Sequence, residues 1–412
     1  MMDGVRREFD LEAIRSDFPI LSRTVHGKPL VYLDSAASAQ KPQQVLDALL
    51  SAYQDTYSNV HRGLHFLSEA STDLYESVRG KVADFIGASS GDEIVLTAGA
   101  TMSLNLIARS WAEPRLQPGD EILISIAEHH ANIVPWQMVA EKTGAKVRAF
   151  TLEDDGAFSM DRLRAEITDR TRIISVPHVS NVLGTVFPIA EIAGVARDIE
   201  ALMVVDGCQG AVHMPVDVTA LGADFYVFSA HKLYGPNGVG VLWGRADILA
   251  DMPPFLGGGD MIDRVTIETS TYAPPPQRFE AGTPAIAETI ALGAAVDYVQ
   301  AIGMEAIRSH EQKILSYAHQ RLSAVEGLNL VGTAAGKSGV VSFTMDCAHP
   351  HDISTIIDHD GVAIRAGHHC AQPLMDHLDL PSTARASVGV YSRTEDFDVL
   401  AESLEKVRRI FG

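Results

Sequence analysis

Short apolar runs alternate with stretches of helical spacing from about residue 85 to residue 245. Ile189–Glu200 has the spacing and composition of a helix and lies between two of these runs. Strand–helix–strand alternation of this kind predicts right-handed crossovers and a mainly parallel sheet, which binds ligands beyond the carboxyl ends of its strands. The runs predicted to be strands are Glu121–Ala127, Arg172–Val176, Ala201–Val205, Phe225–Phe228 and Gly238–Trp243.

The pattern changes after about residue 284, where a long amphipathic stretch, Ala285–Val325, begins. Strands and helices then alternate in a way that predicts a small α+β domain, with which an amphipathic N-terminal piece, Leu11–Phe18, is expected to pack. The predicted domains are therefore a large one over 32–284 and a small one over 1–31 and 285–412. The C-terminal elements expected are strands at Val340–Thr344, Val362–Ala366 and Ala384–Val390 and helices at Asp352–Asp358 and Thr394–Ile410.

The charge balance limits the partners of this chain of 412 residues, a length that suits two domains. With 33 basic and 53 acidic residues, the formal charge is -20. Such a field repels nucleic acid and anionic membrane surfaces, so neither is expected as a partner.

Three features predict a soluble cytoplasmic protein. No run of about 18 apolar residues is present, so no transmembrane helix is expected. The first ten residues are charged and lack the apolar core of a secretory signal. Three cysteines, an odd and small number, argue against a disulfide framework and favour a reducing compartment.

Lys232 directly follows an apolar strand and precedes a turn-forming segment, Gly235–Gly238. An exposed loop charge is the ordinary interpretation of a lysine, but this setting indicates a partly desolvated pocket. A lysine in such a pocket can form a Schiff base with an aldehyde. Ser229 and His231 flank it with donors suited to a phosphate.

Other polar residues follow strands or open helices in the same region. Asp206 follows a buried strand, where it can cap a helix or pair with a protonated pyridine nitrogen, and Gln209 would then reach the ring hydroxyl. Thr101, after Gly99, opens a predicted helix whose N-terminus suits a phosphate. His129 is interpreted as a ring stacked on a cofactor and able to pass protons. A metal site with His130 is the alternative, although adjacent histidines point in different directions.

Cys370 ends a polar segment, Arg365–Cys370, that contains one arginine and two histidines. These neighbours can stabilise a thiolate, the reactive form of cysteine, whereas a buried inert thiol is expected in apolar surroundings. Zinc bound by His368, His369 and Cys370 is an alternative. Arg385 either makes a surface salt bridge or binds a substrate carboxylate with its two N–H groups.

The sequence resembles the fold-type I pyridoxal-phosphate enzymes, specifically the group II cysteine desulfurases of the Suf iron–sulfur assembly system, over almost its whole length. The segments that carry the resemblance are Tyr32–Ala37, His61–Gly63, Glu128–Asn132, Ser180–Asn181, Asp206–Gln209, Ser229–Lys232, Gly235–Gly238, Arg278–Pro284 and Arg365–Pro373.

The resemblance implies a large domain with a mainly parallel seven-stranded sheet, a small α+β C-terminal domain, and a homodimer that uses pyridoxal 5'-phosphate. It implies that Lys232 carries the cofactor and moves protons, and that Cys370 takes the sulfur of L-cysteine as a persulfide. A sulfur-acceptor protein of the Suf system is the implied partner. The implied cofactor contacts are Thr101, His129, Asp206, Gln209, Ser229 and His231, with Thr283 from the other subunit, and the implied substrate contacts are Asn181, Arg365 and Arg385.

The sequence departs from the family pattern at Gly99-Ala100-Thr101-Met102, where relatives usually carry two threonines followed by a glutamate. Thr101 remains for the phosphate, while Ala100 removes a hydroxyl and Met102 removes a carboxylate.

Three other activities remain open on the residues alone. A selenocysteine lyase or cysteine sulfinate desulfinase would use the same site without needing Cys370. An aminotransferase would release a keto acid and would also have no use for Cys370. A non-catalytic scaffold of a sulfur-transfer complex would need neither Lys232 nor Asp206.

Overall fold

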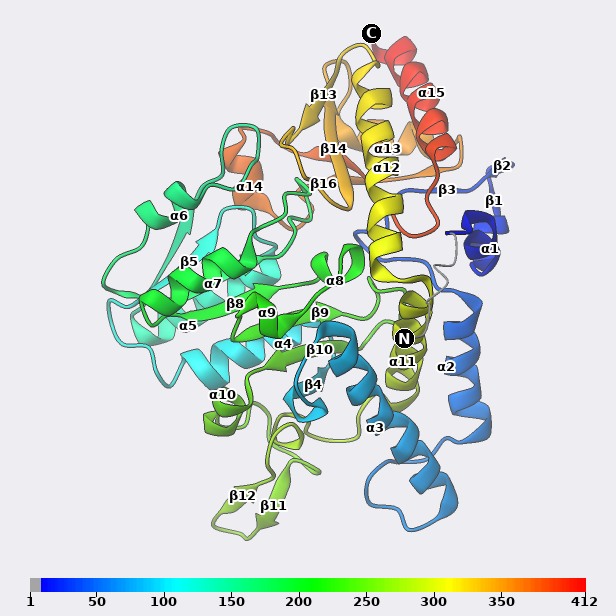
Figure 1. The fold of residues 1–412 in the computed structure, drawn as a ribbon. Helices are drawn as coiled ribbons and strands as arrows, with labels where there is room; N and C mark the ends of the chain where they lie inside the picture. The colour runs from blue at the N-terminus through cyan, green and yellow to red at the C-terminus, as the bar shows by residue number, and fades with distance from the viewer. Residues whose placement is uncertain (1–8) are drawn as a thin grey trace, which may run out of the picture.

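The computed structural model describes residues 9–412, and its centre is a seven-stranded sheet (Figure 1). Only β10 runs antiparallel to its neighbours, so the predicted mainly parallel sheet is confirmed. The expectation that no secretory signal is present rests mainly on residues 1–8, which lie outside the described residues. In spatial order the strands are β4 (Ile94–Thr97), β10 (Gly240–Gly244), β9 (Phe225–Ser229), β8 (Leu202–Asp206), β7 (Thr171–Pro177), β5 (Glu121–Ser125) and β6 (Lys146–Phe150).

The five strands expected in this sheet are all present, with ends displaced by one or two residues. β4 and β6 are additional. β6 lies at the edge of the sheet, and its sequence, Lys-Val-Arg-Ala-Phe, is only partly buried. An edge strand of this kind lacks the continuous apolar run by which buried parallel strands are recognised.

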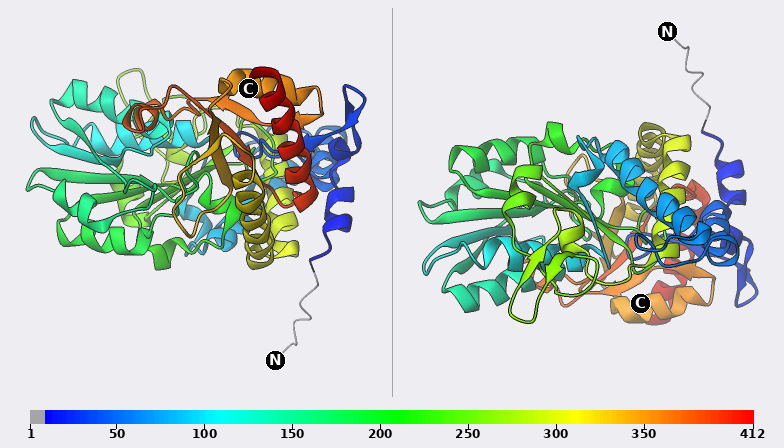
Figure 2. Two further views of the ribbon diagram at one scale, coloured as in Figure 1. Left: turned by 90° about the horizontal axis from the view of Figure 1, so that it is seen from above. Right: turned by 90° about the horizontal axis from the view of Figure 1, so that it is seen from below.

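Helices cover both faces of the sheet (Figure 2), because successive strand residues point to opposite sides. Ile122 and Ile124 of β5 pack into one core, while Leu123 between them packs into the other. The first core is closed by α4 (Ala100–Leu106), α5 (Val134–Thr143) and α10 (Ala246–Asp251). The second is closed by α3 (Phe66–Ile86), α7 (Ile189–Asp198), α8 (Gly210–His213) and α9 (Val218–Leu221).

A second sheet, which is antiparallel, forms in the C-terminal part, where strands and helices were expected to alternate. The expected strand Val362–Ala366 is divided between two sheets, because its first residues pair in parallel with β3 (Val31–Tyr32). The strands are β13 (Leu328–Val331), β14 (Val340–Met345), β17 (Thr383–Ser387) and β16 (Arg365–Gly367), with β15 (Val362–Ala363) on β3. α12 (Met304–Ser323), α13 (Pro350–Asp358) and α15 (Thr394–Phe411) pack with this sheet.

The expected amphipathic stretch Ala285–Val325 forms two helices. α11 (Ile286–Ile302) and α12 meet at Gly303 with a bend of 74°. Gly303 has a φ of +93°, a conformation that other residues adopt only with strain. Among the described residues no single helix is long and apolar enough to cross a membrane; only this bent pair reaches that length and composition together.

The boundaries of the two domains stay a prediction. α11 packs on α2 (Gln43–Asp55) and α3, whereas α12 packs on α15. α1 (Leu11–Ser16) contacts both parts: Ile14 belongs to the core of the large sheet, and Arg15 forms an ion pair with Asp396.

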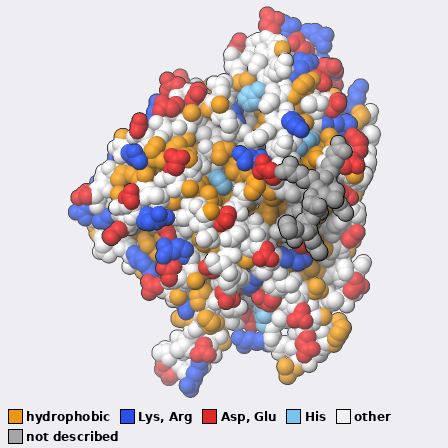
Figure 3. All heavy atoms as spheres, in the orientation of Figure 1, with side chains coloured by type: hydrophobic (Ala, Val, Ile, Leu, Met, Phe, Trp, Pro, Cys, Tyr) orange, Lys and Arg blue, Asp and Glu red, His pale blue; other side chains and the backbone are white. Residues whose placement is uncertain are grey.

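The remaining elements lie at the periphery. A hairpin of β11 (Ile262–Val265) and β12 (Ser270–Tyr272) projects from the lower edge in Figure 1, with Ile267 at its tip almost fully exposed. On the face shown in Figure 3, acidic and basic side chains are interspersed rather than gathered into one basic patch. The other elements are β1 (Thr24–Val25), β2 (Lys28–Pro29), α6 (Met160–Ala165) and α14 (Gln372–His377).

Candidate active site

A cavity of about 390 Å³ lies at the carboxyl ends of the central parallel strands, where the antiparallel sheet meets the large one. Polar residues from both parts of the chain line it. Ten of the predicted site residues are among them: Thr101, His129, Asn181, Asp206, Ser229, His231, Lys232, Arg365, Cys370 and Arg385.

Two neighbouring parallel strands bring Asp206 and Lys232 to this cavity. β8 ends at Asp206, and β9 ends at Ser229, three residues before Lys232. The Asp206 side chain is 6 % exposed, and its Oδ1 accepts a hydrogen bond from the backbone N–H of Cys208 at 2.9 Å. One carboxylate oxygen is thereby held in place, and the buried carboxylate faces the same cavity as the amine of Lys232.

The N-terminal turn of α4 supplies backbone donors beside Ser229. The Ser229 hydroxyl oxygen accepts a hydrogen bond from the backbone N–H of Ala100 at 2.9 Å, next to Thr101. The turn lies close to β10, because a Cβ at Gly240 would come within 2.4 Å of the Gly99 Cα. Hydroxyl groups and free N–H groups at a helix N-terminus suit a phosphate, so this end of the cavity fits an anion.

A partly buried lysine that the sequence analysis did not identify, Lys41, lies behind His231. Lys41 Nζ donates hydrogen bonds to the backbone carbonyls of Ala39 and His231, the latter at 3.0 Å. Burial lowers the pKa of Lys41 to about 8. Burial, with help from the charges of Lys232 and Lys41, also lowers the pKa of His231 to about 4, so the His231 ring is neutral at pH 7.

His129 is a neutral ring whose tautomer is set by the backbone. Burial and the nearby Lys232 charge lower the pKa of His129 to about 4. Its Nδ1 accepts a hydrogen bond from the backbone N–H of Ala131 at 3.0 Å, which leaves the ring proton on Nε2. Behind it, Glu128 is fully buried, and burial together with the charge of Asp206 raises the pKa of this carboxyl well above its ordinary value.

The segment around Cys370 is held by hydrogen bonds from residues that follow strands of the large sheet. The backbone N–H of His130 donates to the Cys370 carbonyl at 2.6 Å, and its Nε2 accepts from the backbone N–H of Gln372 at 3.0 Å. Asn181 Nδ2 donates to the His369 carbonyl at 2.8 Å. His130 is therefore an anchor of this segment, a function that a sequence pattern cannot indicate.

Two consecutive residues in this segment adopt left-handed backbone conformations, His369 with a φ of +52° and Cys370 with a φ of +56°. Such conformations are strained for residues other than glycine and persist only where the surroundings impose them. The result is an exposed Cys370 side chain at the rim of the cavity.

Both predicted arginines share one carboxylate, Asp34, which the sequence analysis did not assign to the site. Arg365, which is half exposed, donates to Asp34 at 2.8 Å, and Arg385 lies 3.5 Å from the same carboxylate. Arg385 is 2 % exposed and also donates to the Asn181 carbonyl at 2.9 Å. Its Nε has no hydrogen-bond partner among the described residues, which leaves a buried donor for an anionic group.

The two remaining predicted residues do not line this cavity. Gln209 is buried, and its side-chain N–H donates to the carbonyl of Ala36 at 3.0 Å. Thr283 is exposed and lies in a different pocket, together with Met102.

The three cysteines are free and differ in surroundings. Cys208 lines the cavity but is buried, and burial with the charge of Asp206 raises the pKa of its thiol. Cys347 is partly buried. Within residues 9–412, no three His, Cys, Asp or Glu side chains are grouped to hold a metal ion. The ring of His369 instead hydrogen-bonds to Thr383 at 2.9 Å.

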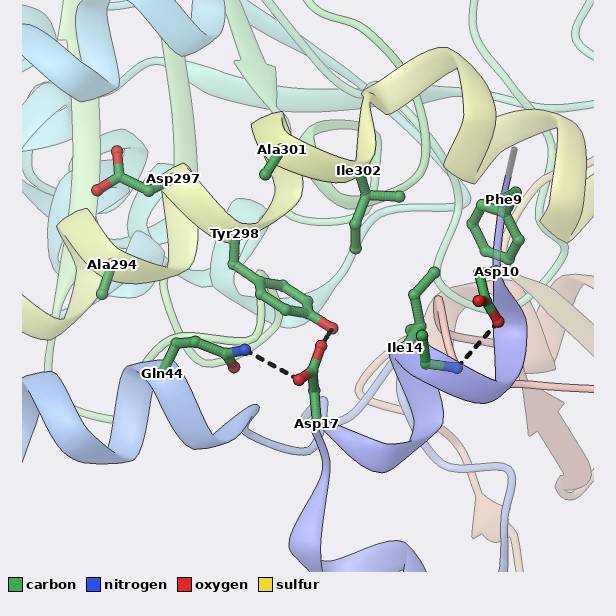
Figure 4. Close-up of a pocket in the computed structure, with 11 residues that line it drawn as sticks. Phe9, Asp10, Ile14, Asp17, Gln44, Ala294, Asp297, Tyr298, Ala301 and Ile302 are labelled. Atoms are coloured by element: carbon green, nitrogen blue, oxygen red, sulfur yellow. Dashed lines mark hydrogen bonds between the residues drawn. The ribbon is translucent and has the colours of Figure 1, made fainter. Parts of the chain in front are cut away.

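A larger cavity, of about 530 Å³, lies elsewhere, between α1, α2 and α11 (Figure 4). Its main polar group, Asp17, already accepts hydrogen bonds from Gln44 at 2.9 Å and from Tyr298 at 3.0 Å. Its lining contains neither lysine, histidine nor cysteine, so its size does not make it a catalytic site.

Comparison with known families and proteins gives one consistent result. The aminotransferase class-V family matches residues 31–400. A probable cysteine desulfurase of Streptomyces coelicolor is 50% identical over 410 residues, covering 98% of both chains. A cysteine desulfurase of Yersinia pestis is 48% identical over 405 residues, covering 98% of this chain and 100% of its own.

Solved structures show the same similarity. The cysteine desulfurase CsdA of Escherichia coli superposes with a TM-score of 0.92 at 39% identity, covering 98% of this chain and 100% of its own. An apo cysteine desulfurase of Thermococcus onnurineus superposes with a TM-score of 0.91 at 36% identity, covering 97% and 98%.

Proposed function

This chain belongs to the class-V aminotransferase family, and within it to the cysteine desulfurases, and on that premise we propose the following activity. The protein is a pyridoxal-phosphate-dependent enzyme that converts L-cysteine to L-alanine and retains the sulfur as a persulfide on Cys370. The observation that carries the proposal is the shared cavity, which brings Lys232, Asp206 and Cys370 together with a buried arginine, Arg385.

The residues of the cavity fit the cofactor at both of its ends. The first turn of α4, with Thr101 and Ser229, offers donors for the phosphate, and the buried carboxylate of Asp206 suits a protonated pyridine nitrogen. Lys232 lines the same cavity and is the amine that would hold the aldehyde carbon. When bound, pyridoxal phosphate supplies an electron sink for the substrate Cα.

The substrate carboxylate is assigned to Arg385 and Asn181. Arg385 is the only one of the two cavity arginines that is buried, and its unpartnered Nε is a donor that a carboxylate can satisfy. Arg365 remains half exposed and bound to Asp34. We therefore assign Arg365 to the charge balance around Cys370 and the substrate entrance.

Proton movements are assigned to Lys232 and His129. The amine of Lys232 takes the proton from the substrate Cα and returns protons during alanine formation. The neutral His129 ring lines the same cavity and, with Nδ1 occupied by a backbone N–H, keeps a single proton on Nε2 that it can donate.

The sulfur-transfer step belongs to Cys370. Its thiolate attacks the sulfur of L-cysteine, so that an S–S bond forms and the Cβ–S bond of the substrate breaks. The electron pair of the broken bond stays on Cβ, which takes a proton to give the methyl group of L-alanine. No external oxidant or reductant is needed, because the persulfide and alanine together contain the atoms of L-cysteine and the thiol.

The exposed position of Cys370 supports transfer of the persulfide to a second protein. The segment that carries it is anchored by His130 and Asn181 and cannot travel far, so the acceptor must come to the cavity rim. We assign this enzyme to the group II, Suf-type desulfurases that supply iron–sulfur cluster assembly in the cytoplasm. The short Arg365–Pro373 segment supports this assignment.

We further propose that the active form is a homodimer. Thr283 is exposed and does not line the cavity of its own chain, which supports a contact with the phosphate of another copy. The exposed apolar residues of the nearby hairpin, Val265 and Ile267, support an interface on this side.

The first experiment compares the wild-type protein with Lys232→Ala and Cys370→Ala. Wild type is expected to show a visible cofactor band and to form alanine and Cys370-bound sulfane sulfur in equal amounts from L-cysteine. Lys232→Ala is expected to lose the band that reports the covalent linkage. Cys370→Ala is expected to keep the band but lose alanine formation by at least about a hundredfold, because the nucleophile is absent.

The same variants separate the competing activities. Turnover of selenocysteine or cysteine sulfinate that survives in Cys370→Ala, with little wild-type activity on L-cysteine, would assign the protein to the lyases or desulfinases. Release of a keto acid in place of alanine would indicate an aminotransferase. A wild-type protein that takes up no pyridoxal phosphate would contradict the enzymatic proposal and leave the scaffold.

A further inference from the structure

A buried chain of hydrogen bonds connects Gln209 to helix α12. Gln209 Nε2 donates to the Ala36 carbonyl at 3.0 Å, and Gln209 Oε1 lies 3.3 Å from His213 Nε2. The other ring nitrogen of His213, Nδ1, lies 2.7 Å from Glu311 Oε2. Gln209 is 3 % exposed, and His213 and Glu311 are each 1 % exposed.

The carbonyl of Ala36 determines how the side chains of Gln209 and His213 are oriented. A backbone carbonyl only accepts hydrogen bonds, so the amide nitrogen of Gln209 must face Ala36 and its oxygen must face His213. The Nε2 atom of His213 therefore carries a proton that it donates to Gln209. Glu311, on the opposite side of the ring, places Oε2 2.7 Å from Nδ1 and so fixes the orientation of the imidazole.

The ring of His213 is held on three sides. α8 carries it, α12 supplies Glu311, and the segment before β14 closes on it at Gly339. A Cβ at Gly339 would come within 2.5 Å of His213 Nε2. Simple packing does not require three buried polar side chains in this position, since buried polar groups are costly unless every partner is present.

Two residues in contact with Gln209 line the active-site cavity. Ala36, to which its amide nitrogen is bonded, lines the cavity, and so does Cys208, the preceding residue. With its oxygen and one N–H already used, Gln209 has one further N–H to offer. The amide can present only a donor there, never an acceptor.

We propose that Glu311 and His213 are positioning residues that hold the Gln209 amide as a hydrogen-bond donor to the ring oxygen of the cofactor. The inference rests on the proposed function, which assigns Gln209 to the pyridoxal-phosphate ring. Because Glu311 comes from α12 and Gln209 from the segment between β8 and α8, the arrangement couples the packing of α12 to the protonation of the bound cofactor.

A hydrogen-bond donor to the ring oxygen stabilises the deprotonated form of that oxygen. Loss of the donor therefore shifts the pH midpoint of the cofactor band, which a change in packing alone does not shift. The test uses the holoenzyme and measures the pH midpoint of the visible cofactor band and the rate of cofactor release on dilution. In Glu311→Gln the volume is kept, but the charged acceptor beside His213 Nδ1 is replaced by a neutral amide, so the ring is held less firmly against Gln209. We expect a higher midpoint and a release rate increased about tenfold, the effect of one hydrogen bond to a charged group.

A double variant protects the test against misfolding. His213→Phe with Glu311→Met removes the ring nitrogens and the carboxylate together, so no buried charge is left without a partner. It is expected to shift both readouts in the same direction as Glu311→Gln. The matched control is His310→Gln, one residue earlier on α12, whose ring contacts the Ser392 carbonyl at 2.8 Å and not Gln209; both readouts should stay at the wild-type values.

The decisive comparison adds Glu311→Gln to a Gln209→Leu background. If Glu311 acts through Gln209, the single Gln209→Leu variant shifts the midpoint and the second substitution adds nothing. Equal shifts of Glu311→Gln in both backgrounds, or none in the wild-type background, would overturn the inference and leave the desulfurase assignment intact. A wild-type protein without a Lys232-dependent band would instead overturn the proposed function, and the inference with it.

Discussion

Asp34 is the residue on which the charge balance of the site depends. It is the counter-ion of both Arg365 and Arg385, and its own side chain is 13% exposed. Burial lowers the pKa of Arg385 to about 10 although Asp34 opposes this shift, so the guanidinium remains charged at pH 7. Without Asp34 this buried charge would have no anionic partner.

We expect Asp34→Asn to destabilise the protein by about 3 kcal/mol and to raise the KM for L-cysteine, because it leaves a buried arginine without its counter-ion. The measurements are urea unfolding and steady-state kinetics. Asp297→Asn is the control: Asp297 pairs with Lys81 on the surface, where both side chains are more than a third exposed, and its loss should cost less than about 1 kcal/mol. Equal effects of the two substitutions would contradict this assignment.

The cysteines of the cavity should differ in reactivity, because Cys370 is exposed whereas Cys208 is buried. Burial also raises the pKa of the Cys208 thiol, which keeps it in the unreactive protonated form. Limited treatment with iodoacetamide, followed by peptide mass spectrometry, should place the label on Cys370 at least about tenfold faster than on Cys208. Comparable labelling of Cys208 would show that it is not shielded in solution.

At the scale of the elements, the bend between α11 and α12 determines how the C-terminal sheet approaches the cavity. α11 packs on α2 and α3, and α12 carries Glu311 to His213. The bend is placed at Gly303, the one residue between the two helices. The direction of α12 thus depends on a backbone conformation that is available chiefly to glycine.

We expect Gly303→Ala to destabilise the protein by about 1–2 kcal/mol, since a Cβ is strained at a φ of +93° even though no other atom lies within 4 Å. Gly194→Ala is the matched control. Gly194 lies inside α7 with ordinary helical geometry and equally open surroundings, so alanine there should stabilise the fold by about 0.5–1 kcal/mol. Thermal and urea unfolding of both variants would measure this difference, and a neutral Gly303→Ala would remove the conformational explanation of the bend.

At the scale of the whole molecule, burial keeps several histidines neutral. Burial is the largest cause in each case. It lowers the pKa to about 3 for His369. It lowers the pKa to about 4 for His129, His178, His231 and His319. In the unfolded chain these rings take up protons below about pH 6.5, while in the folded protein they resist protonation until about pH 4.

The free energy of unfolding should therefore fall as the pH is lowered from 6.5 toward 4, because the unfolded state binds more protons over that range. Glu128 and Asp396, whose pKa values are raised chiefly by burial, act in the opposite direction but are fewer. Urea unfolding at pH 7.5 and pH 5.5 tests the sign. His319→Gln, which removes one of these rings, should give a shallower pH dependence, and greater stability at pH 5.5 would contradict the prediction.

The sequence by itself determined the chemistry and the order of the elements. Buried parallel strands are apolar throughout, so their runs are recognisable, and the polar residue that ends each strand must lie at one edge of the sheet. That is why Asp206 and Lys232 could be placed in one site from the sequence alone. An edge strand such as β6 and a helix break such as Gly303 leave weaker signals, because their conformations depend on neighbours far along the chain.

Only the tertiary structure decided which side chains became partners. Asp34 and Arg385 are separated by most of the chain, and Gln209 and Glu311 by about a quarter of it, yet the first pair meets directly and the second is joined through His213. Local sequence specifies strands and turns through interactions between near neighbours. The counter-ion of a buried arginine, the anchor of the Cys370 segment and the support of Gln209 arise where separate elements meet, and only the packed fold defines these contacts.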